Sequence, residues 1–350
     1  MKKKIILVLA IIFLIVPFSN SQNYIIQVKP ANSEVWKYAD INGKIIIDCD
    51  YPSTYPFSED GIALEYYPKK DQYILIDIKG KVIPTKIDQF VVKDALGYGA
   101  RGFSDGLLVY GVGKLWGCMD LNGNVVIPAK YDNLSPFNGG YAIGEKNNMF
   151  FVVDKTGKEI PVEEKNLADI KHFEENLAPI ISKDQKKGFI GIDGKIAVPL
   201  QFKSIGYFSN GIAWAKNDKE LVGFINTKGE WIIPAKFTSA KDFDKESGLA
   251  QAKMGDTWGY VNEKGEFISF NIEAPDDFFE GLAKGKKGDR VGFYNNKGEW
   301  VIKPEFEGAR DFKNGFAAVK KDGLWGIIDK EGKWMIKPTF SGIKDVVKLK

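Results

Sequence analysis

The sequence predicts an all-β protein built as a tandem array of about nine short repeats. Nine turn glycines recur at intervals of 33 to 43 residues: Gly43, Gly80, Gly123, Gly157, Gly194, Gly229, Gly265, Gly298 and Gly332. A near-constant period in this range is typical of repeat architectures. The apolar runs beside each glycine are too short for helices and rich in β-branched and aromatic residues, which favours strands.

Residues 1–21 have the layout of a secretory signal peptide. Three lysines come first, an apolar run from Ile5 to Val16 follows, and small residues precede Gln22. The run is short for a membrane span, and an uncleaved N-terminal anchor is the alternative. We therefore expect a signal peptide over 1–21 and one repeat array over 22–350. The array would be exported to the periplasm, the outer surface or the medium.

The composition excludes several classes of protein. The chain has 49 basic and 46 acidic residues, and residues 1–21 hold three of the lysines and no acid, which leaves 46 of each. Such a balance argues against a nucleic-acid or anionic-membrane partner, and no later stretch is apolar enough for an integral span. Cys49 and Cys118 are the only cysteines. We expect both to be small buried residues, because two cysteines do not make a disulfide scaffold.

Each repeat begins with a short apolar strand that ends in a tight turn. In the ninth copy the strand is Leu324–Asp329 and the turn glycine is Gly332. The residue three positions before the glycine is Asp or Asn in every copy except that of Gly194, where Gly191 stands. Asp or Asn caps the amides of a type I turn, and glycine adopts the left-handed conformation that closes it.

A second strand follows the turn, and a third strand completes the repeat. We expect a recurring Pro, such as Pro234, to end the second strand, because Pro cannot donate to a ladder. A Phe-x-x-Gly-like segment, such as Phe208 to Gly211, then opens a short third strand, here Ile212 to Ala215. Each repeat is therefore expected to contain three strands and no helix.

A second glycine recurs six residues before the turn glycine, for example Gly223 and Gly326. Glycine inside a strand costs roughly 0.5–1 kcal/mol, so its recurrence indicates a close approach by something bulky. We expect a Trp ring from the neighbouring strand, Trp231 and Trp334 in these copies, to cover the bare glycine.

These motifs resemble a known family. Trp116-Gly117, Trp258-Gly259 and Trp325-Gly326, each followed by the turn and a Pro-x-Phe/Tyr element, are similar to the WG-repeat family of bacterial proteins. The similarity covers roughly residues 35 to 340. The resemblance implies a β-repeat fold, and it brings no catalytic residues because the family is defined by its repeat.

Stacked repeats can bury each other's apolar faces in two ways: as an open, twisted β-solenoid-like array or as a closed, β-propeller-like ring. Three-stranded copies of this length are shorter than the usual blades of about 40–45 residues, and nine exceeds the usual number of blades. Both observations favour the open array. The closed ring is the alternative, since the segment from Tyr24 to Lys29 resembles a third strand that could complete the last copy.

The residue types favour a binding protein over an enzyme. His172 is the sole histidine and is interpreted as a surface loop residue, so nucleophile–His arrangements and His/Cys metal sites are not expected. We expect no cofactor. Trp214 is the candidate binding residue, because the corresponding positions of other copies are small or polar. Trp231, Trp300 and Trp334 are expected in the core.

The predicted function is that of an exported, non-enzymatic repeat protein. It would bind a protein or an envelope polysaccharide along the surface of its stacked repeats, where the copies vary. The alternative is a glycan-acting hydrolase that uses carboxylates from neighbouring repeats. A structural spacer without a specific ligand is the third possibility.

Overall fold

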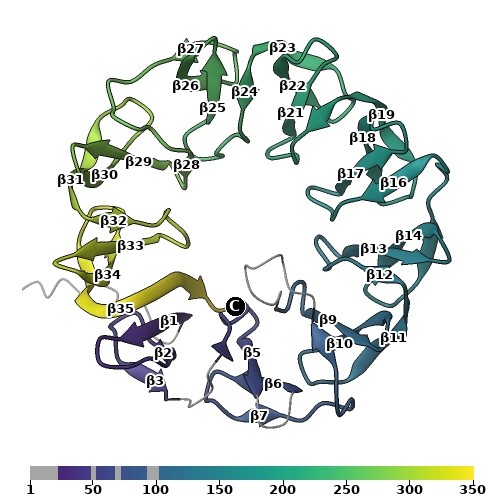
Figure 1. Ribbon diagram of the computed structural model, residues 1–350, viewed down its shortest axis with the longest axis horizontal. Helices are drawn as coiled ribbons and strands as arrows, with labels where there is room; N and C mark the ends of the chain where they lie inside the picture. Colours follow the sequence, from purple (N-terminus) through teal and green to yellow (C-terminus); the bar gives the residue numbers. More distant parts are fainter. Residues whose placement is uncertain (1–22, 49–52, 68–71, 93–101) are drawn as a thin grey trace, which may run out of the picture.

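The computed structural model describes residues 23–48, 53–67, 72–92 and 102–350. Every element assigned within these ranges is a β-strand. The strands form separate antiparallel sheets arranged in a ring (Figure 1). The predicted all-β repeat array is confirmed. The predicted signal peptide and Cys49 lie outside the described residues, whereas Cys118 is buried as expected.

The described residues form nine four-stranded units. In each unit the strands pair in the order inner, third, first and second strand, and the second strand lies on the outside of the ring (Figure 1). Units 2 to 4 are β4 (Ser53–Thr54), β5 (Ile62–Tyr67), β6 (Gln72–Asp77) and β7 (Val82–Ile83); β8 (Val91–Val92), β9 (Leu107–Val112), β10 (Leu115–Asp120) and β11 (Val125–Tyr131); and β12 (Asn133–Leu134), β13 (Tyr141–Lys146), β14 (Met149–Asp154) and β15 (Glu159–Pro161). Units 5 and 6 are β16 (Leu167–Ile170), β17 (Leu177–Ser182), β18 (Lys187–Gly191) and β19 (Ile196–Phe202); and β20 (Ser204–Ile205), β21 (Ile212–Lys216), β22 (Val222–Asn226) and β23 (Trp231–Phe237). Units 7 and 8 are β24 (Ser239–Ala240), β25 (Leu249–Met254), β26 (Thr257–Asn262) and β27 (Phe267–Ile268); and β28 (Phe278–Phe279), β29 (Leu282–Lys287), β30 (Arg290–Tyr294) and β31 (Trp300–Phe306).

The remaining two units share one long strand. Unit 9 consists of β32 (Gly308–Ala309), β33 (Phe316–Lys321), β34 (Leu324–Asp329) and the first part of β35 (Trp334–Lys348). Unit 1 consists of the second part of β35 with β1 (Tyr24–Pro30), β2 (Lys37–Ala39) and β3 (Ile45–Ile47). Units 9 and 1 therefore form a single seven-stranded sheet.

The inner strand was not predicted, and it corrects the expected three-stranded unit. In unit 6 it consists of two residues, Ser204 and Ile205, which pair with Lys216 and Ala215 of the third strand. A strand of two residues is too short to show a period in the sequence.

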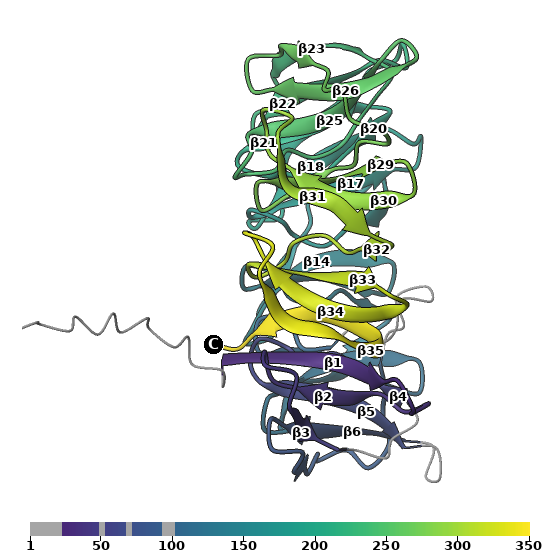
Figure 2. The ribbon, with the colours of Figure 1, turned by 90° about the vertical axis from the view of Figure 1, so that its left-hand side faces the viewer.

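The two ends of the described chain close the ring. β1 pairs antiparallel with β35, from Tyr24 opposite Lys348 to Pro30 opposite Phe340, and the two strands lie side by side in Figure 1 and Figure 2. The Leu349 amide donates to the Asn23 carbonyl at 2.8 Å. β1 thus acts as the third strand of unit 1. The chain forms the closed alternative rather than the open array, because its first strand supplies the partner that the last copy lacks.

The predicted turn is confirmed. In the first copy, Asp40 Oδ1 accepts hydrogen bonds from the amides of Asn42 and Lys44 at 2.9 and 3.0 Å. The Gly43 amide donates to the Asp40 carbonyl at 3.0 Å, and Gly43 has a φ of +83°. Asn226 makes the same contacts in the sixth copy. The hairpin at the outer edge therefore keeps one geometry around the ring.

Proline does not end the second strand in most units, which corrects the prediction. The strands β11, β19, β23, β31 and β35 run through Pro128, Pro199, Pro234, Pro304 and Pro338. In units 3, 5, 6 and 8 this strand is the outer edge of its sheet, so a missing N–H breaks no ladder there. Proline on an exposed edge also discourages pairing with another chain.

The bare strand glycines are approached mainly by backbone, not by the predicted Trp ring. A Cβ added to Gly223 would lie 2.5 Å from the Ile233 carbonyl oxygen and 2.7 Å from the Ala235 nitrogen. The register between β22 and β23 shifts at this point, which brings the second strand over the glycine. A Cβ added to Gly326 would also lie 2.7 Å from an atom of the Trp334 ring, so in this copy the predicted ring does contribute.

The hydrophobic core lies in layers between neighbouring units. Between units 6 and 7, Phe224 and Phe237 share a cluster with Phe243, Ala250 and Ala252. The small alanines on the third strand leave room for the rings of the preceding unit. Full burial of each large apolar side chain contributes roughly 1.5–3 kcal/mol, so these layers hold the ring together.

The turns after the inner strands tie neighbouring units together. The Glu175 carboxylate of unit 5 accepts hydrogen bonds from the amides of Asn210 and Gly211 of unit 6 at 2.6 and 2.8 Å. Glu280 of unit 8 accepts from Asn314 and Gly315 of unit 9 at the same distances. These charge-assisted bonds fix the inner edge of the ring.

Candidate functional site

The copies change character at one position on the inner edge of the ring. A recurring Phe, or Val346 in unit 1, lies in or after each inner strand. We call the residues that immediately precede it, one in each unit, the inner belt. From unit 1 to unit 9 the inner belt reads Asp345, Pro56, Gly102, Pro136, His172, Tyr207, Asp242, Asp277 and Asp311. The inner belt is therefore apolar or without a side chain in units 2–4 and polar elsewhere.

The centre of the third strand changes in a similar way. This position is held by Leu64, Val109, Ile143 and Pro179 in units 2–5 and by Trp214, Gln251 and Lys284 in units 6–8. In unit 9 it is Ala318, which is apolar. We define the polar arc as the inner-belt residues of units 5–9 and 1 together with Trp214, Gln251, Lys284 and Arg310. The apolar arc consists of the corresponding positions of units 2–4.

Trp214, the predicted binding residue, lies in the polar arc. It is half-buried on β21, and its indole N–H favours the ionised form of the Asp242 carboxyl group of unit 7. A Cβ added to Gly206 would lie 2.2 Å from the indole Nε1, so the missing side chain of Gly206 makes room for the ring. The indole is thus held between its own unit and the next.

The other tryptophans are less buried than predicted. Trp231, expected in the core, is 39% exposed, and its ring meets Phe202 of the preceding unit edge-on at 5.5 Å. Trp300 and Trp334 are half-buried. The second strand that carries Trp231 lies at the outer edge of its sheet, which leaves one side of the ring open to solvent.

Asp242 and Asp277 are neighbouring carboxylates from adjacent units. Asp242 is solvent-exposed in the concave inner wall, where surrounding protein, and then the charge of Asp277, raise its pKa to about 6. Burial also raises the pKa of Asp277, with Asp276 and Asp311 adding to the effect. Asp277 Oδ1 is buried and has no hydrogen-bond partner among the described residues. Lys241 acts on both carboxylates in the opposite direction, but burial outweighs it and both pKa values stay raised.

Farther along the polar arc, carboxylates and cations are paired. Lys284 Nζ lies 2.8 Å from Asp311 of the next unit and 3.1 Å from Asp276. Burial opposes the charged form of Lys284, but the two carboxylates outweigh it and raise the lysine pKa. Arg310 Nη1 lies 3.2 Å from Asp345. The polar arc is therefore a mixed-charge surface rather than an acidic one.

His172 lies in a loop, as predicted, and begins the polar arc. Its ring is half-buried and stacks on Tyr207 of unit 6, with centroids 4.5 Å apart. His172 Nδ1 lies 3.0 Å from the Tyr207 hydroxyl, and Nε2 lies 3.7 Å from Glu174. Neighbouring inner-belt residues thus contact each other across the boundary between units.

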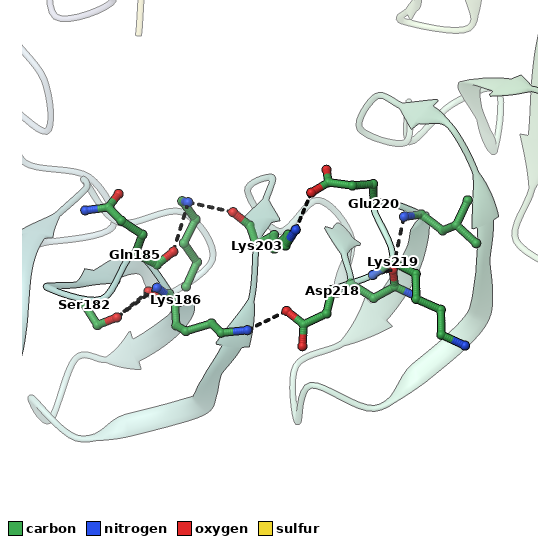
Figure 3. A network of polar contacts seen from close by, with 10 residues as sticks. Ser182, Gln185, Lys186, Lys203, Asp218, Lys219 and Glu220 are labelled. Atoms are coloured by element: carbon green, nitrogen blue, oxygen red, sulfur yellow. Dashed lines mark hydrogen bonds and ion pairs between the residues drawn. The ribbon is translucent and has the colours of Figure 1, made fainter.

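The loops between third and first strands form a separate polar cleft between units 5 and 6 (Figure 3). The cleft has a volume of ≈ 420 Å³. Lys186 and Lys203 cross it to Asp218 and Glu220, both at 2.5 Å, and Lys187 donates to the Lys203 carbonyl. Exposed pairs of this kind contribute at most about 1 kcal/mol each. The cleft is confined to the boundary between two units, whereas the polar arc extends over several units.

The polar arc was missed by reasoning from sequence, although a signal for it was present. Attention went to residues that recur, such as the turn Asp and the Phe, because these define the fold. The informative position is the one before that Phe, where Asp242, Asp277, Asp311 and Asp345 follow one another in successive copies. Aligning the copies on the Phe would have revealed it.

A family model describes most of this pattern. The model for the WG containing repeat matches residues 38–64, 116–150, 188–220, 223–258, 292–325 and 325–348, which together make up more than half of the chain. The chain belongs to this family. Comparison of the WG-repeat chain with curated protein sequences finds no significant match.

One of the solved structures that align with this WG-repeat protein shares its fold. A crystal structure of the eukaryotic initiation factor aligns with a TM-score of 0.62 at 11% identity, covering 93% of this chain and 98% of that one. At this identity the likeness shows the fold alone. Dipeptidyl peptidase 4 of Porphyromonas gingivalis aligns with a TM-score of 0.47 at 9% identity, covering 81% of this chain and 59% of that one. The computationally designed Ika8 protein gives 0.45 at 14%, covering 80% and 93%. Both of these scores are too low to support a conclusion about this chain.

Two further findings bear on the partners of the WG-repeat protein. Across the part of the chain that the structure describes, there is no helix of the length and apolarity that a bilayer span requires. In the same residues, His, Cys, Asp and Glu side chains do not gather in groups of three or more that could hold a metal ion.

Proposed function

We propose that this WG-repeat protein is an exported, non-enzymatic binding module whose ligand contacts the polar arc. The observation that carries the proposal is the division of the inner edge into a polar and an apolar arc on one repeated frame. The repeated fold forms with either set of side chains at these positions. The difference between the two arcs is therefore best explained by a ligand that contacts one of them.

The chemistry of the polar arc suits an envelope polysaccharide better than an apolar ligand. Trp214 offers part of an indole ring, and the ring is fixed in orientation by Asp242 and Gly206. Farther along the polar arc, carboxylates, a lysine and an arginine offer acceptors and donors for hydroxyl groups. Fixed aromatic surfaces with a few placed polar groups are typical of selective binding sites. A protein partner with polar side chains is the other occupant that this surface would accept.

Export is proposed from the sequence. Three lysines, the apolar run from Ile5 to Val16 and the small residues before Gln22 have the order of a cleavable signal peptide. An exported binding module would meet its ligand in the envelope or outside the cell.

A glycan-acting hydrolase is the second candidate, and one observation favours it. Asp242 and Asp277 are carboxylates from neighbouring units, and both have raised pKa values. A protonated carboxyl group beside an ionised one is the arrangement that glycoside hydrolysis uses. We rank it second for two reasons. Asp242 already interacts with Trp214, and the same position is Asp in four successive units, which indicates an extended binding surface rather than a single catalytic centre.

A glycan array and a pull-down from envelope extract, both with the mature protein, test the proposal. Asp242→Asn, which keeps the shape of the site, and Trp214→Phe, which shortens the aromatic surface and removes the indole N–H, should each lower binding at least about tenfold. Pro56→Ala, at the same inner-belt position in the apolar arc, should leave it unchanged. Equal binding by all variants would overturn the assignment to the polar arc. Turnover of a bound glycan that Asp242→Asn or Asp277→Asn abolishes would establish the hydrolase instead.

A further inference from the structure

A glutamate is fully buried where units 1 and 2 meet. Glu65 on β5 has 0% of its side chain exposed and sits beside Tyr38 of β2, which is likewise fully buried. Isolated buried carboxylates are rare, because ionisation in a low-dielectric interior is costly. Glu65 therefore calls for a physical explanation that turns and packing do not supply.

The hydrogen bonds around Glu65 require an additional proton. The Tyr38 hydroxyl is within bonding distance of two acceptors, Glu65 Oε1 and, at 2.6 Å, the Tyr55 carbonyl oxygen. A hydroxyl has one hydrogen, so it satisfies one acceptor. If Glu65 carries a proton, it donates to the Tyr38 hydroxyl, which donates onward to the Tyr55 carbonyl. Each group in this relay is then paired.

The surroundings of Glu65 also favour the neutral acid. Burial raises its pKa to about 8, and the bond with Tyr38 only partly opposes this. Gln27 of β1 directs its amide N–H groups at Thr54, and Gln27 Oε1 and Glu65 Oε2 have no hydrogen-bond partner among the described residues. Ile74 of β6, which faces Glu65 across the sheet, is apolar. None of these neighbours brings a positive charge that would stabilise an ionised Glu65.

The position of this relay links it to the closure of the ring. The apolar cluster around Tyr38 includes Ile25 of β1, and Val347 and Leu349 pack against it from the C-terminal end. These segments are the two ends that pair to close the ring. The relay thus holds unit 2 against the unit in which both chain ends meet.

We propose that Glu65 is protonated in the closed ring and that its ionisation loosens the contact between units 1 and 2, which makes the closure sensitive to pH. When Glu65 loses its proton, Tyr38 turns its only hydrogen to the carboxylate. The hydrogen bond from Tyr38 to the Tyr55 carbonyl is then lost, and a negative charge without a cationic partner among Tyr38, Gln27 and Ile74 lies between the two units. Both changes favour separation of the two units.

The sign of the effect follows from linkage. Between the ordinary glutamate pKa of 4.5 and about 8, the folded chain keeps a proton that the unfolded chain has lost. Stability should therefore fall as the pH rises through this window and level off above it. Tyr38, Gln27, Thr54 and Tyr55 face Glu65 from the neighbouring elements, and the pKa of Glu65 depends on burial and Tyr38.

Denaturant unfolding between pH 5 and 9.5 tests the proposal, with Glu65→Gln as the main variant, because an amide can donate to Tyr38 but cannot ionise. Relative to Glu65→Gln, the unfolding equilibrium constant of the wild type should rise by up to about tenfold per pH unit up to about pH 8. Glu263→Gln, on an exposed turn, is the matched control and should follow the wild type. Parallel pH curves for the wild type and Glu65→Gln would overturn the proposal.

Hydrogen exchange locates the effect independently of global unfolding. After correction for the intrinsic pH dependence of exchange, amides of β1, β2 and β5 should lose protection between pH 6 and 9 in the wild type. They should keep it in Glu65→Gln, and amides of unit 7 should lose less protection than these in the wild type. A uniform loss of protection around the ring would contradict a local device at this contact.

Discussion

The apolar and polar arcs share one frame and differ in what they present at its inner edge. In unit 4, Pro136 and Ile143 occupy the inner belt and the centre of the third strand. In unit 8 the same positions are held by Asp277 and Lys284. Both units have four strands, the same order of strands and the same buried Phe, namely Phe137 and Phe278.

This contrast separates residues that build the ring from residues that the frame leaves free. The turn Asp or Asn, the turn glycine and the core Phe recur because every unit needs them to fold. The inner belt can be Pro, Gly or Asp, so its identity is not fixed by folding. In a repeat protein, specific properties therefore reside at positions where the copies disagree.

The largest expected effect tests whether the units that carry the two arcs have equally stable cores. Phe137→Ala in unit 4, which carries part of the apolar arc, and Phe243→Ala in unit 7, which carries part of the polar arc, each remove a buried ring from a core layer. Each should lower the free energy of unfolding by about 3–5 kcal/mol, through lost burial and the cavity left behind. Urea denaturation measures both. A small loss for one and a large loss for the other would show that the arcs differ in their frame as well.

The parts of the fold that could be predicted from sequence are local. The turn at Gly43 needs only Asp40, a glycine and flanking β-formers, so its contacts appear as expected. The two-residue inner strand at Ser204 has no such pattern, since it is defined by pairing with Lys216. Pro234 was misjudged because tolerance of Pro depends on whether the strand is at an edge, which the sequence alone does not state.

Closure and the polar arc are properties of the whole ring. The pairing of Tyr24 with Lys348 joins residues at opposite ends of the chain, so no local period could decide between an open array and a ring. The contact between Trp214 and Asp242 likewise depends on how one unit leans on the next. Trp214 was selected because it is unusual among the copies, and that criterion is the one that also identifies the inner belt.

An intermediate effect is expected where charge replaces apolar packing. Lys284→Met removes the cation that lies between Asp276 and Asp311 and leaves two half-buried carboxylates without it. The variant should lose about 1–3 kcal/mol at low ionic strength and less in concentrated salt, which screens the ion pairs that the variant lacks. Ile143→Met, at the same strand position in the apolar arc, should cost less than about 1.5 kcal/mol at either salt concentration. Denaturation at the two salt concentrations measures both, and a salt-independent loss for Lys284→Met would contradict the ion-pair account.

The smallest effect is expected at the inner belt itself, because Asp242 is solvent-exposed. Its folded pKa of about 6 lies above the ordinary value of 3.8, so the native state keeps a proton that the unfolded state loses between these pH values. Wild-type stability should therefore decline slightly from pH 4 to 6, and Asp242→Asn should flatten that decline.

Pro136→Ala, its counterpart in the apolar arc, is the control and should shift stability without altering its dependence on pH. Calorimetric melting temperatures across this range separate the outcomes. An unchanged slope in Asp242→Asn would mean that Asp242 is no more confined than an ordinary surface carboxylate, and the polar arc would lose its distinctive electrostatics.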